Sequence, residues 1–304
     1  MHSKIKSIKT KKKSTENRQW ADKFESLIFG CAHDCKYCYA KAMAVQFKRK
    51  TPGNWKNEVV RNSDLLKKEF RKRNYLTMFP SAHDITPEHL QENMIYLYNI
   101  LKPGNEVLIV SKPHLDCVKS MCDTFIPFKA NILFRFTIGS ADADTLKFWE
   151  NNAPDFNERM ESLQYAFNAG YETSVSCEPM LDDKIDQVIE KVSPYVTEKI
   201  WLGNPNQLMR RLSFNGFKDD LVTMSRGRAL MKLFSDEYIL NLYARYQSNP
   251  KIMWKSSIEN IIKIWNMGIE YDYLLTQIFS DYESVVGKDS LIRVEAFKFL
   301  QCSL

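Results

Sequence analysis

The strongest constraint on the fold is a regular alternation between short apolar runs and longer segments with helical periodicity. Each apolar run is rich in β-branched and aromatic residues and is bounded by Gly, Pro, Asn or Ser, as strands usually are. Several runs are almost continuously apolar, which is typical of strands buried on both faces of a parallel sheet. The six predicted strands are Ser26–Gly30, Tyr75–Pro80, Glu106–Ser111, Asn131–Ile138, Glu172–Cys177 and Lys199–Gly203.

The segments between these runs carry signals for helix ends. Thr86 and Pro87 predict a helix start, with threonine as the N-cap, and Gly104 predicts its end. Asp155 and Gly170 bracket another predicted helix. Strands that alternate with helices at this spacing predict repeated right-handed βα units and an α/β fold. In such folds the functional loops follow the carboxyl ends of the strands.

Composition and hydrophobic periodicity predict three regions along the chain. Residues 1–19 are basic and polar and are predicted to form a disordered tail. Residues 20–205 hold the alternating core, and residues 206–304 are mainly helical, with one further short strand predicted at Lys251–Lys255. The helices predicted in this last region are Asp219–Phe234, Ser235–Gln247, Ser256–Met267, Tyr271–Val286 and Ser290–Leu300.

The charge is distributed unevenly. The net charge is +6, but residues 1–73 hold 20 Lys/Arg against 7 Asp/Glu, and the rest of the chain is net acidic. Such asymmetry favours a polyanionic partner, with nucleic acid first in line. The alternative is a solubilising tail followed by a solvated helix face. No stretch approaches the roughly 18 apolar residues that span a bilayer, and the N-terminus lacks an apolar signal segment, so we expect a cytoplasmic protein with no membrane partner.

Three of the seven cysteines crowd into one short string, GCAHDCKYCYA, which runs from Gly30 to Ala40. Cys31, Cys35 and Cys38 have the spacing C-x3-C-x2-C, and thiolates are the ligands that iron–sulfur clusters select. Three ligands would leave one iron of a cubane with an open coordination position. The alternative is a Cys3His zinc site that uses one of the five histidines, although the sequence has no second ligand pair of the kind that structural zinc usually draws on.

This motif, with Tyr37 just before the last cysteine and a predicted strand just before the first, resembles the radical S-adenosylmethionine (SAM) superfamily. The local string is most similar to the branch that includes spore photoproduct lyase. The resemblance extends more weakly to about residue 205, where it implies a partial (β/α)6 barrel. It implies a [4Fe–4S] cluster on the three cysteines, with SAM bound at the open iron.

The resemblance also implies a reaction. A cellular electron donor such as flavodoxin or ferredoxin would reduce the cluster, which would cleave SAM to methionine and a 5′-deoxyadenosyl radical. That radical would abstract a hydrogen atom from the substrate, with the protein supplying placement and exclusion of water. The basic first quarter favours a nucleic acid or nucleotide substrate. A peptide or small metabolite would use the same fold, since substrate choice resides in loops.

Candidate SAM-binding residues follow the predicted strands. After the second strand, the loop lacks the glycines usual in the superfamily, so Ser81 and Asp84 are the candidates for the methionine ammonium, or else they are helix caps. The other candidates lie near the ends of later strands or in the cysteine string. They are Thr137 and Ser140 for the ribose, Ser174, Ser176 and Glu178 along the fifth strand, and Asn204 and Tyr37 for the adenine.

Two further residues stand out by their chemistry. Arg135 lies inside an apolar strand, where a guanidinium must pair or face a polar cavity, and the SAM carboxylate is one candidate partner. Cys177 ends a strand beside Glu178 and is a candidate hydrogen-atom donor, although free cysteines are commonly inert core residues. A metal-stabilised nucleic-acid-binding module without catalysis is the alternative for the whole chain, and it would hold zinc rather than iron.

Overall fold

The computed structural model describes residues 19–67 and 70–268. The chain divides into two compact units, residues 1–259 and 260–304, and the first holds every strand of the described part. The predicted basic tail (except residue 19), the predicted helices Tyr271–Val286 and Ser290–Leu300, and Cys302 lie outside the described residues. The domain boundary near residue 205 stays a prediction.

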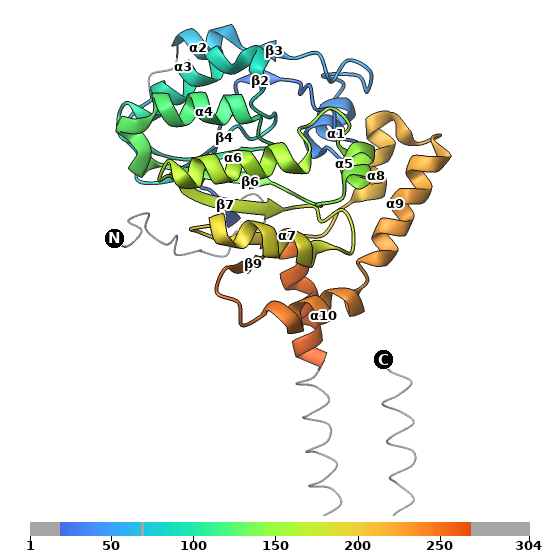
Figure 1. The fold of residues 1–304 in the computed structure, drawn as a ribbon. Helices are drawn as coiled ribbons and strands as arrows, with labels where there is room; N and C mark the ends of the chain where they lie inside the picture. The colour runs from blue at the N-terminus through green and yellow to red at the C-terminus, as the bar shows by residue number, and fades with distance from the viewer. Residues whose placement is uncertain (1–18, 68–69, 269–304) are drawn as a thin grey trace, which may run out of the picture. The chain divides into compact units, whose positions relative to one another are not determined.

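A seven-stranded sheet organises the first unit (Figure 1). Every neighbouring pair of strands is parallel, and the strands follow one another in chain order across the sheet. The α/β class with parallel strands is therefore confirmed. The strands are β1 (Lys23–Phe24), β4 (Leu76–Phe79), β5 (Glu106–Ser111), β6 (Ile132–Thr137), β7 (Glu172–Cys177), β8 (Ile200–Leu202) and β9 (Ile252–Trp254).

The prediction that Ser26–Gly30 forms the first strand of the parallel sheet is wrong. The strand that opens the large sheet is β1, a few residues earlier, and β2 (Ile28–Phe29) instead pairs antiparallel with β3 (Val59–Val60). After β1 the amide of Leu27 donates to Nε2 of His83 at 3.3 Å rather than to a strand carbonyl. The cysteine string therefore follows β2, one strand of this small antiparallel pair, and not a strand of the main sheet.

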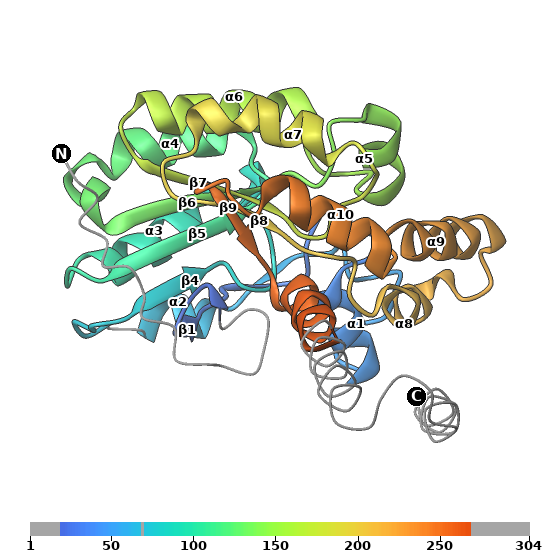
Figure 2. The same cartoon turned by 90° about the horizontal axis from the view of Figure 1, so that it is seen from below.

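Helices fill the connections between strands. Figure 2 shows α4 (Leu115–Thr124), α6 (Phe156–Asn168) and α7 (Ile185–Val192) along one side of the sheet. The helix predicted between Asp155 and Gly170 is confirmed as α6, and the Asp155 side chain caps it by accepting from the Glu158 amide. Thr86, in contrast, makes no side-chain cap before the short 3-10 turn Pro87–His89 that leads into α3 (Leu90–Leu101).

The remaining helices are shorter or lie toward the end of the described chain. They are α1 (Tyr39–Gln46), α2 (Asn62–Lys67), α5 (Ala143–Trp149), α8 (Leu208–Leu212), α9 (Leu221–Leu233) and α10 (Asp236–Tyr246), with a π-helical turn at Ser213–Phe217, 3-10 turns at Ile126–Asn131 and Ser193–Tyr195, and a further helix over 256–268. Along residues 19–67 and 70–268, no helix is long and apolar enough to cross a membrane.

Candidate functional site

A cavity of about 490 Å³ lies at the carboxyl ends of the parallel strands. This is where an open parallel sheet places its ligands. All three cysteines of the C-x3-C-x2-C string reach it, together with residues that follow β4, β5, β6, β7 and β8. The predicted site residues along its wall are Cys31, Cys35, Cys38, Tyr37, Ser81, Asp84, Thr137, Glu178 and Asn204.

The cysteine loop begins at a glycine that no other residue can replace without strain. Gly30 has a φ of +111°, and a Cβ there would lie 2.7 Å from the carbonyl oxygens of both Trp55 and Asn57. The Cys31 amide donates to the same Trp55 carbonyl at 3.2 Å, so the segment that follows α1 packs directly against the start of the cysteine loop. Asp34 adds a left-handed turn, with a φ of 46°.

The last cysteine starts a helix. The Sγ atom of Cys38 accepts from the amide of Lys41 at 3.4 Å and serves as the N-cap of α1. Lys41 is only 2% exposed and pairs with Asp34 at 2.7 Å, which ties the loop to the helix that follows it. Asn215 holds the loop from the other side, because its side-chain amide donates to the carbonyls of Lys36 and Cys38 at 2.8 and 3.0 Å.

Tyr37 is anchored by a buried ion pair. Its hydroxyl donates to Glu150 at the end of α5, and Glu150 in turn pairs with Arg159 of α6. The side chains of Glu150 and Arg159 are both fully buried, so this ion pair is shielded from water. The aromatic ring between the last two cysteines is thus fixed against the cavity wall.

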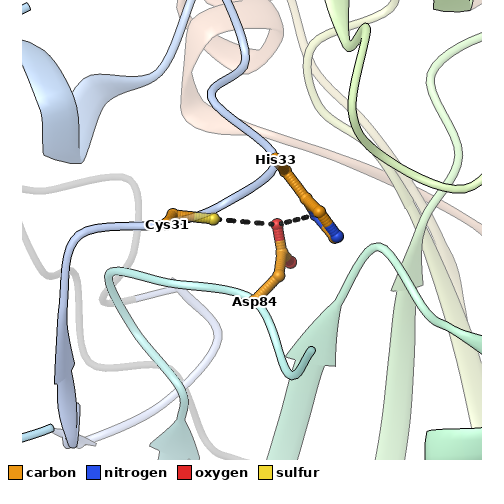
Figure 3. Close-up of side chains that lie close together, drawn as sticks. All are labelled: Cys31, His33 and Asp84. Carbon is orange, nitrogen blue, oxygen red and sulfur yellow. Dashed lines mark hydrogen bonds and ion pairs between the residues drawn. The ribbon is translucent and has the colours of Figure 1, made fainter. Parts of the chain in front are cut away.

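Asp84 is the most heavily bonded group at the cavity. One carboxylate oxygen accepts from the Lys112 amide at 2.8 Å and from the Ser111 hydroxyl at 3.1 Å. The other lies 2.8 Å from Nδ1 of His33 and 3.8 Å from the Cys31 sulfur, as Figure 3 shows. Burial alone would raise the pKa of Asp84, but the charges of Lys112 and His33 hold it well below its usual range.

A chain of polar groups continues from Asp84 toward the surface. Nε2 of His33 lies 3.0 Å from Nε2 of His114, and Nδ1 of His114 lies 3.4 Å from Glu158. His33 is 1% exposed, whereas the side chain of His114 is 23% exposed. These two histidines therefore join the buried carboxylate beside Cys31 to an edge that water reaches.

The donor set suits a metal bound by soft ligands. Burial raises the pKa of Cys31, Cys35 and Cys38, so these thiols stay protonated unless a cation stabilises the thiolates. Among the described residues, the ligand atoms of Cys31, His33 and Asp84 all lie within 4.8 Å of one another, whereas the three thiols do not form such a group. The three thiols nevertheless line one cavity.

Two of the predicted residues lie on the far wall of the cavity. Glu178 pairs at 3.1 Å with Lys255, whose side chain is fully buried after β9. The Oδ1 atom of Asn204 is buried and has no hydrogen-bond partner among the residues described. A buried polar atom of this kind needs a partner, and Asn204 faces the cavity from which one would come.

The other predicted residues do not line the cavity. Arg135 pairs with Glu198 at 2.9 Å and donates to Ser174. The hydroxyl of Ser140 donates to Asp182 in a loop beyond β7. Ser176 and Cys177 are fully buried in the sheet, and burial raises the pKa of the Cys177 thiol. The roles predicted for these five residues stay predictions.

Several groups of the site carry no clear sequence signal. The sequence predicted no role for His33 and His114, Glu150, Asn215 or Lys255, and for Lys112 it favoured a surface lysine over a role at the rim of the site. One signal was present in the string itself, because His33 sits between the first two cysteines. Asn215 and Lys255 lie about 180 and 220 residues beyond that string, and contacts of this range are set by the fold.

Comparisons with known proteins give distant similarities. No family model matches the chain. An uncharacterised protein of Methanocaldococcus jannaschii is 27% identical over 201 residues, which cover 64% of this chain and 76% of that protein. A structure of spore photoproduct lyase complexed with dinucleoside spore photoproduct covers 75% of this chain and 74% of its own, at 13% identity and a TM-score of 0.46. A variant of that enzyme with bound AdoMet and dinucleoside spore photoproduct has 14% identity and a TM-score of 0.47, over the same shares of the two chains.

Proposed function

We propose that this protein is a radical SAM enzyme whose [4Fe–4S] cluster is held by Cys31, Cys35 and Cys38. The observation that carries the proposal is that all three cysteines of the C-x3-C-x2-C string line one cavity at the carboxyl ends of a parallel sheet. When bound, the cluster supplies the electron that cleaves SAM to methionine and a 5′-deoxyadenosyl radical, which takes a hydrogen atom from the substrate.

The residues of the chain would position these groups. Asp84, whose lowered pKa keeps it anionic, lies on the wall where a cationic ammonium would bind. Tyr37, Thr137 and Asn204 offer polar atoms on the same cavity, and Asn204 has a buried acceptor still in need of a donor. The apolar remainder of the wall, such as Met78 and Val110, would keep water from a reactive radical.

Nucleic acid or a nucleotide is the substrate class that we propose. The support is the excess of basic residues in the first quarter of the chain, part of which surrounds the cysteine loop. Spore photoproduct lyase itself has been solved complexed with dinucleoside spore photoproduct. Analysis of the products from a substrate screen distinguishes repair from methylation or another modification.

The proposal is tested by purifying the protein without oxygen, reconstituting it with iron and sulfide, reducing it and adding SAM. The expected result is about four irons and four sulfides per chain and formation of 5′-deoxyadenosine, detected by mass spectrometry. The Cys31→Ala/Cys35→Ala/Cys38→Ala variant should lose both. A matched control is Cys117→Ala/Cys122→Ala, which removes two buried thiols of α4 outside the cavity and should lose neither.

A zinc site is the second candidate, because Cys31, His33 and Asp84 present the sulfur, nitrogen and oxygen ligands that zinc accepts. It predicts one zinc per chain, no labile sulfide after reconstitution, and loss of the metal in His33→Ala. If this pattern is found, the radical SAM proposal is wrong. If the cluster forms instead, addition of oligonucleotides, duplexes and free nucleotides to the deoxyadenosine assay identifies a substrate by its stimulation of SAM cleavage.

A further inference from the structure

An exposed apolar stripe runs along α1 away from the cavity. Tyr39, Met43 and Phe47 are 39%, 50% and 53% exposed, and their spacing of four residues places them on one face of the helix. The stripe is about 12 Å long, at 1.5 Å per residue. Its first residue, Tyr39, also lines the cavity. Such a row of exposed large side chains is a candidate contact surface for another molecule.

The two segments that build this face carry basic side chains and no acidic ones. From Cys35 to Asn57 the chain has six lysines or arginines and no aspartate or glutamate. From Pro205 to Lys218, which includes α8, it has three basic residues and again no acidic residue. A surface made from both segments is therefore complementary to a polyanion.

The fold brings these two segments together, as both views show for α1 and α8 (Figures 1 and 2). Arg210 of α8 donates to the side chain of Gln46 in α1 at 3.3 Å. Gly216, with a φ of +94°, lets the turn after α8 approach so closely that a Cβ would lie 2.8 Å from the Pro52 side chain. Two segments far apart in the chain thus form one continuous face.

Cations and rings alternate on this face. The guanidinium of Arg49 lies 5.4 Å from the ring centroid of Phe47, and that of Arg210 lies 5.6 Å from the ring of Phe214. Arg211 lines the cavity and is half-buried, and its guanidinium has no hydrogen bond or ion pair with any residue that the structure describes. An unpaired guanidinium at the mouth is suited to bind a phosphate of a strand whose next base enters the cavity.

We propose that the face formed by Tyr39, Met43 and Phe47 with Arg49, Arg210 and Arg211 binds single-stranded nucleic acid and delivers one nucleotide to the cavity. Exposed rings that stack bases, flanked by cations that track phosphates, are the recognition mode of single strands. A base inside a duplex is stacked and cannot enter a cavity of this kind without leaving the helix. The inference rests on the proposed function for what happens in the cavity, but the binding itself is tested separately.

The test is fluorescence anisotropy with the reconstituted protein and a fluorescein-labelled single-stranded DNA 12-mer, titrated at several salt concentrations. Arg49→Gln/Arg210→Gln should weaken binding at least tenfold. It should also lower the slope of log affinity against log salt by about 1.4, because two phosphate contacts are lost. Phe47→Ala should weaken binding at least fivefold with little change in that slope. These side chains are exposed, so thermal melting should be unchanged.

A matched control removes the same charge elsewhere. Lys102→Gln/Lys191→Gln, after α3 and in the last turn of α7, should leave affinity and salt slope unchanged. A duplex of the same sequence should bind at least tenfold more weakly than the single strand. The proposal is overturned if the face variants bind like the control, or if the duplex binds as well as the single strand.

The rival occupant is an acidic electron-donor protein. Flavodoxin is the probe: if the face variants keep oligonucleotide affinity but lose flavodoxin binding, the face is a protein dock and the proposal is wrong. The two proposals fail separately. Cysteine-dependent deoxyadenosine without strand binding at this face would remove only the further inference. Strand binding at this face in a protein that forms no cluster would remove only the radical SAM chemistry.

Discussion

Two groups of charged and polar side chains lie near the parallel sheet, and they differ in what they contact. The cysteine-loop group is Asp84, Lys112, Glu150 and Arg159, each bonded to the loop or to a residue that lines the cavity. The β6 group is Arg135, Ser174 and Glu198, and none of these lines the cavity. Both groups interrupt otherwise apolar surroundings, so polarity inside the fold does not by itself identify a site.

The difference follows from position along the strand. Asp84 and Lys112 follow the carboxyl ends of β4 and β5, where the chain turns into loops above the sheet. Arg135 lies in the middle of β6, and its guanidinium stacks 5.0 Å from the ring centroids of both Trp20 and Trp201. A charge at a strand end can face a ligand, whereas one within the strand must be satisfied by its neighbours.

The largest expected effect compares the ion pairs of the two groups. In Glu150→Gln the fully buried Arg159 loses its partner, so we expect a loss of about 3–5 kcal/mol in the free energy of unfolding. In Glu198→Gln the loss should be smaller, about 1 kcal/mol, because the Glu198 side chain is 30% exposed and Arg135 keeps its bond to Ser174 and its contacts with two tryptophan rings. Urea unfolding measures both. Equal losses would contradict the distinction.

The second prediction concerns pH. Burial lowers the pKa of His83 to about 4, and its Nε2 accepts from the Leu27 amide, a bond that protonation would break. The unfolded histidine titrates near ~6.5. The stabilising effect of neutral His83 is therefore complete above about pH 6.5 and is lost as pH falls toward 4, by about 3 kcal/mol at most.

The measurement is the free energy of unfolding at pH 7 and at pH 4.5. His83→Gln keeps an acceptor for the Leu27 amide but cannot titrate, so it should lose most of the difference between the two pH values. Arg135→Met should show the same difference as the wild type. A difference that His83→Gln leaves intact would place the responsible group elsewhere.

The third prediction separates the groups by metal affinity. Asp84→Asn removes a charge 3.8 Å from the Cys31 sulfur and should weaken iron retention about 10–100-fold, as the loss of an outer partner of a metal ligand does. Arg135→Met should retain iron like the wild type. Iron content after a chelator challenge is the measurement. An equal loss in the two variants would show that the β6 group also supports the loop.

The smallest effect is expected within the β6 group. The Ser174 hydroxyl lies 2.9 Å from both Arg135 Nε and Glu198 and donates to the Lys199 carbonyl. Ser174→Ala should cost about 1 kcal/mol in urea unfolding and change neither iron content nor deoxyadenosine formation. A loss of activity in this folded variant would support the predicted site role of Ser174.

Much of the fold could be predicted because its signals are local. Five of the six strands predicted from apolar runs lie in the large sheet, and the short strand predicted at Lys251–Lys255 is β9. The exception, Ser26–Gly30, shows the limit of such signals. Apolar composition predicts an extended segment, but the partner of that segment depends on which amides and carbonyls the rest of the chain presents.

By itself, the sequence determined the α/β class, the cysteine loop and its place after an extended segment, because strand periodicity, turn residues and thiol spacing act over a few residues. Only the tertiary structure decided which charges meet. In the folded chain Arg135 pairs with Glu198, and Asp84 lies beside both His33 and Cys31. Asn215, far along the chain, donates to the cysteine loop. The physical reason is that a buried charge or amide is satisfied by whichever partner the packing brings within about 3 Å, and sequence distance plays no part in that choice.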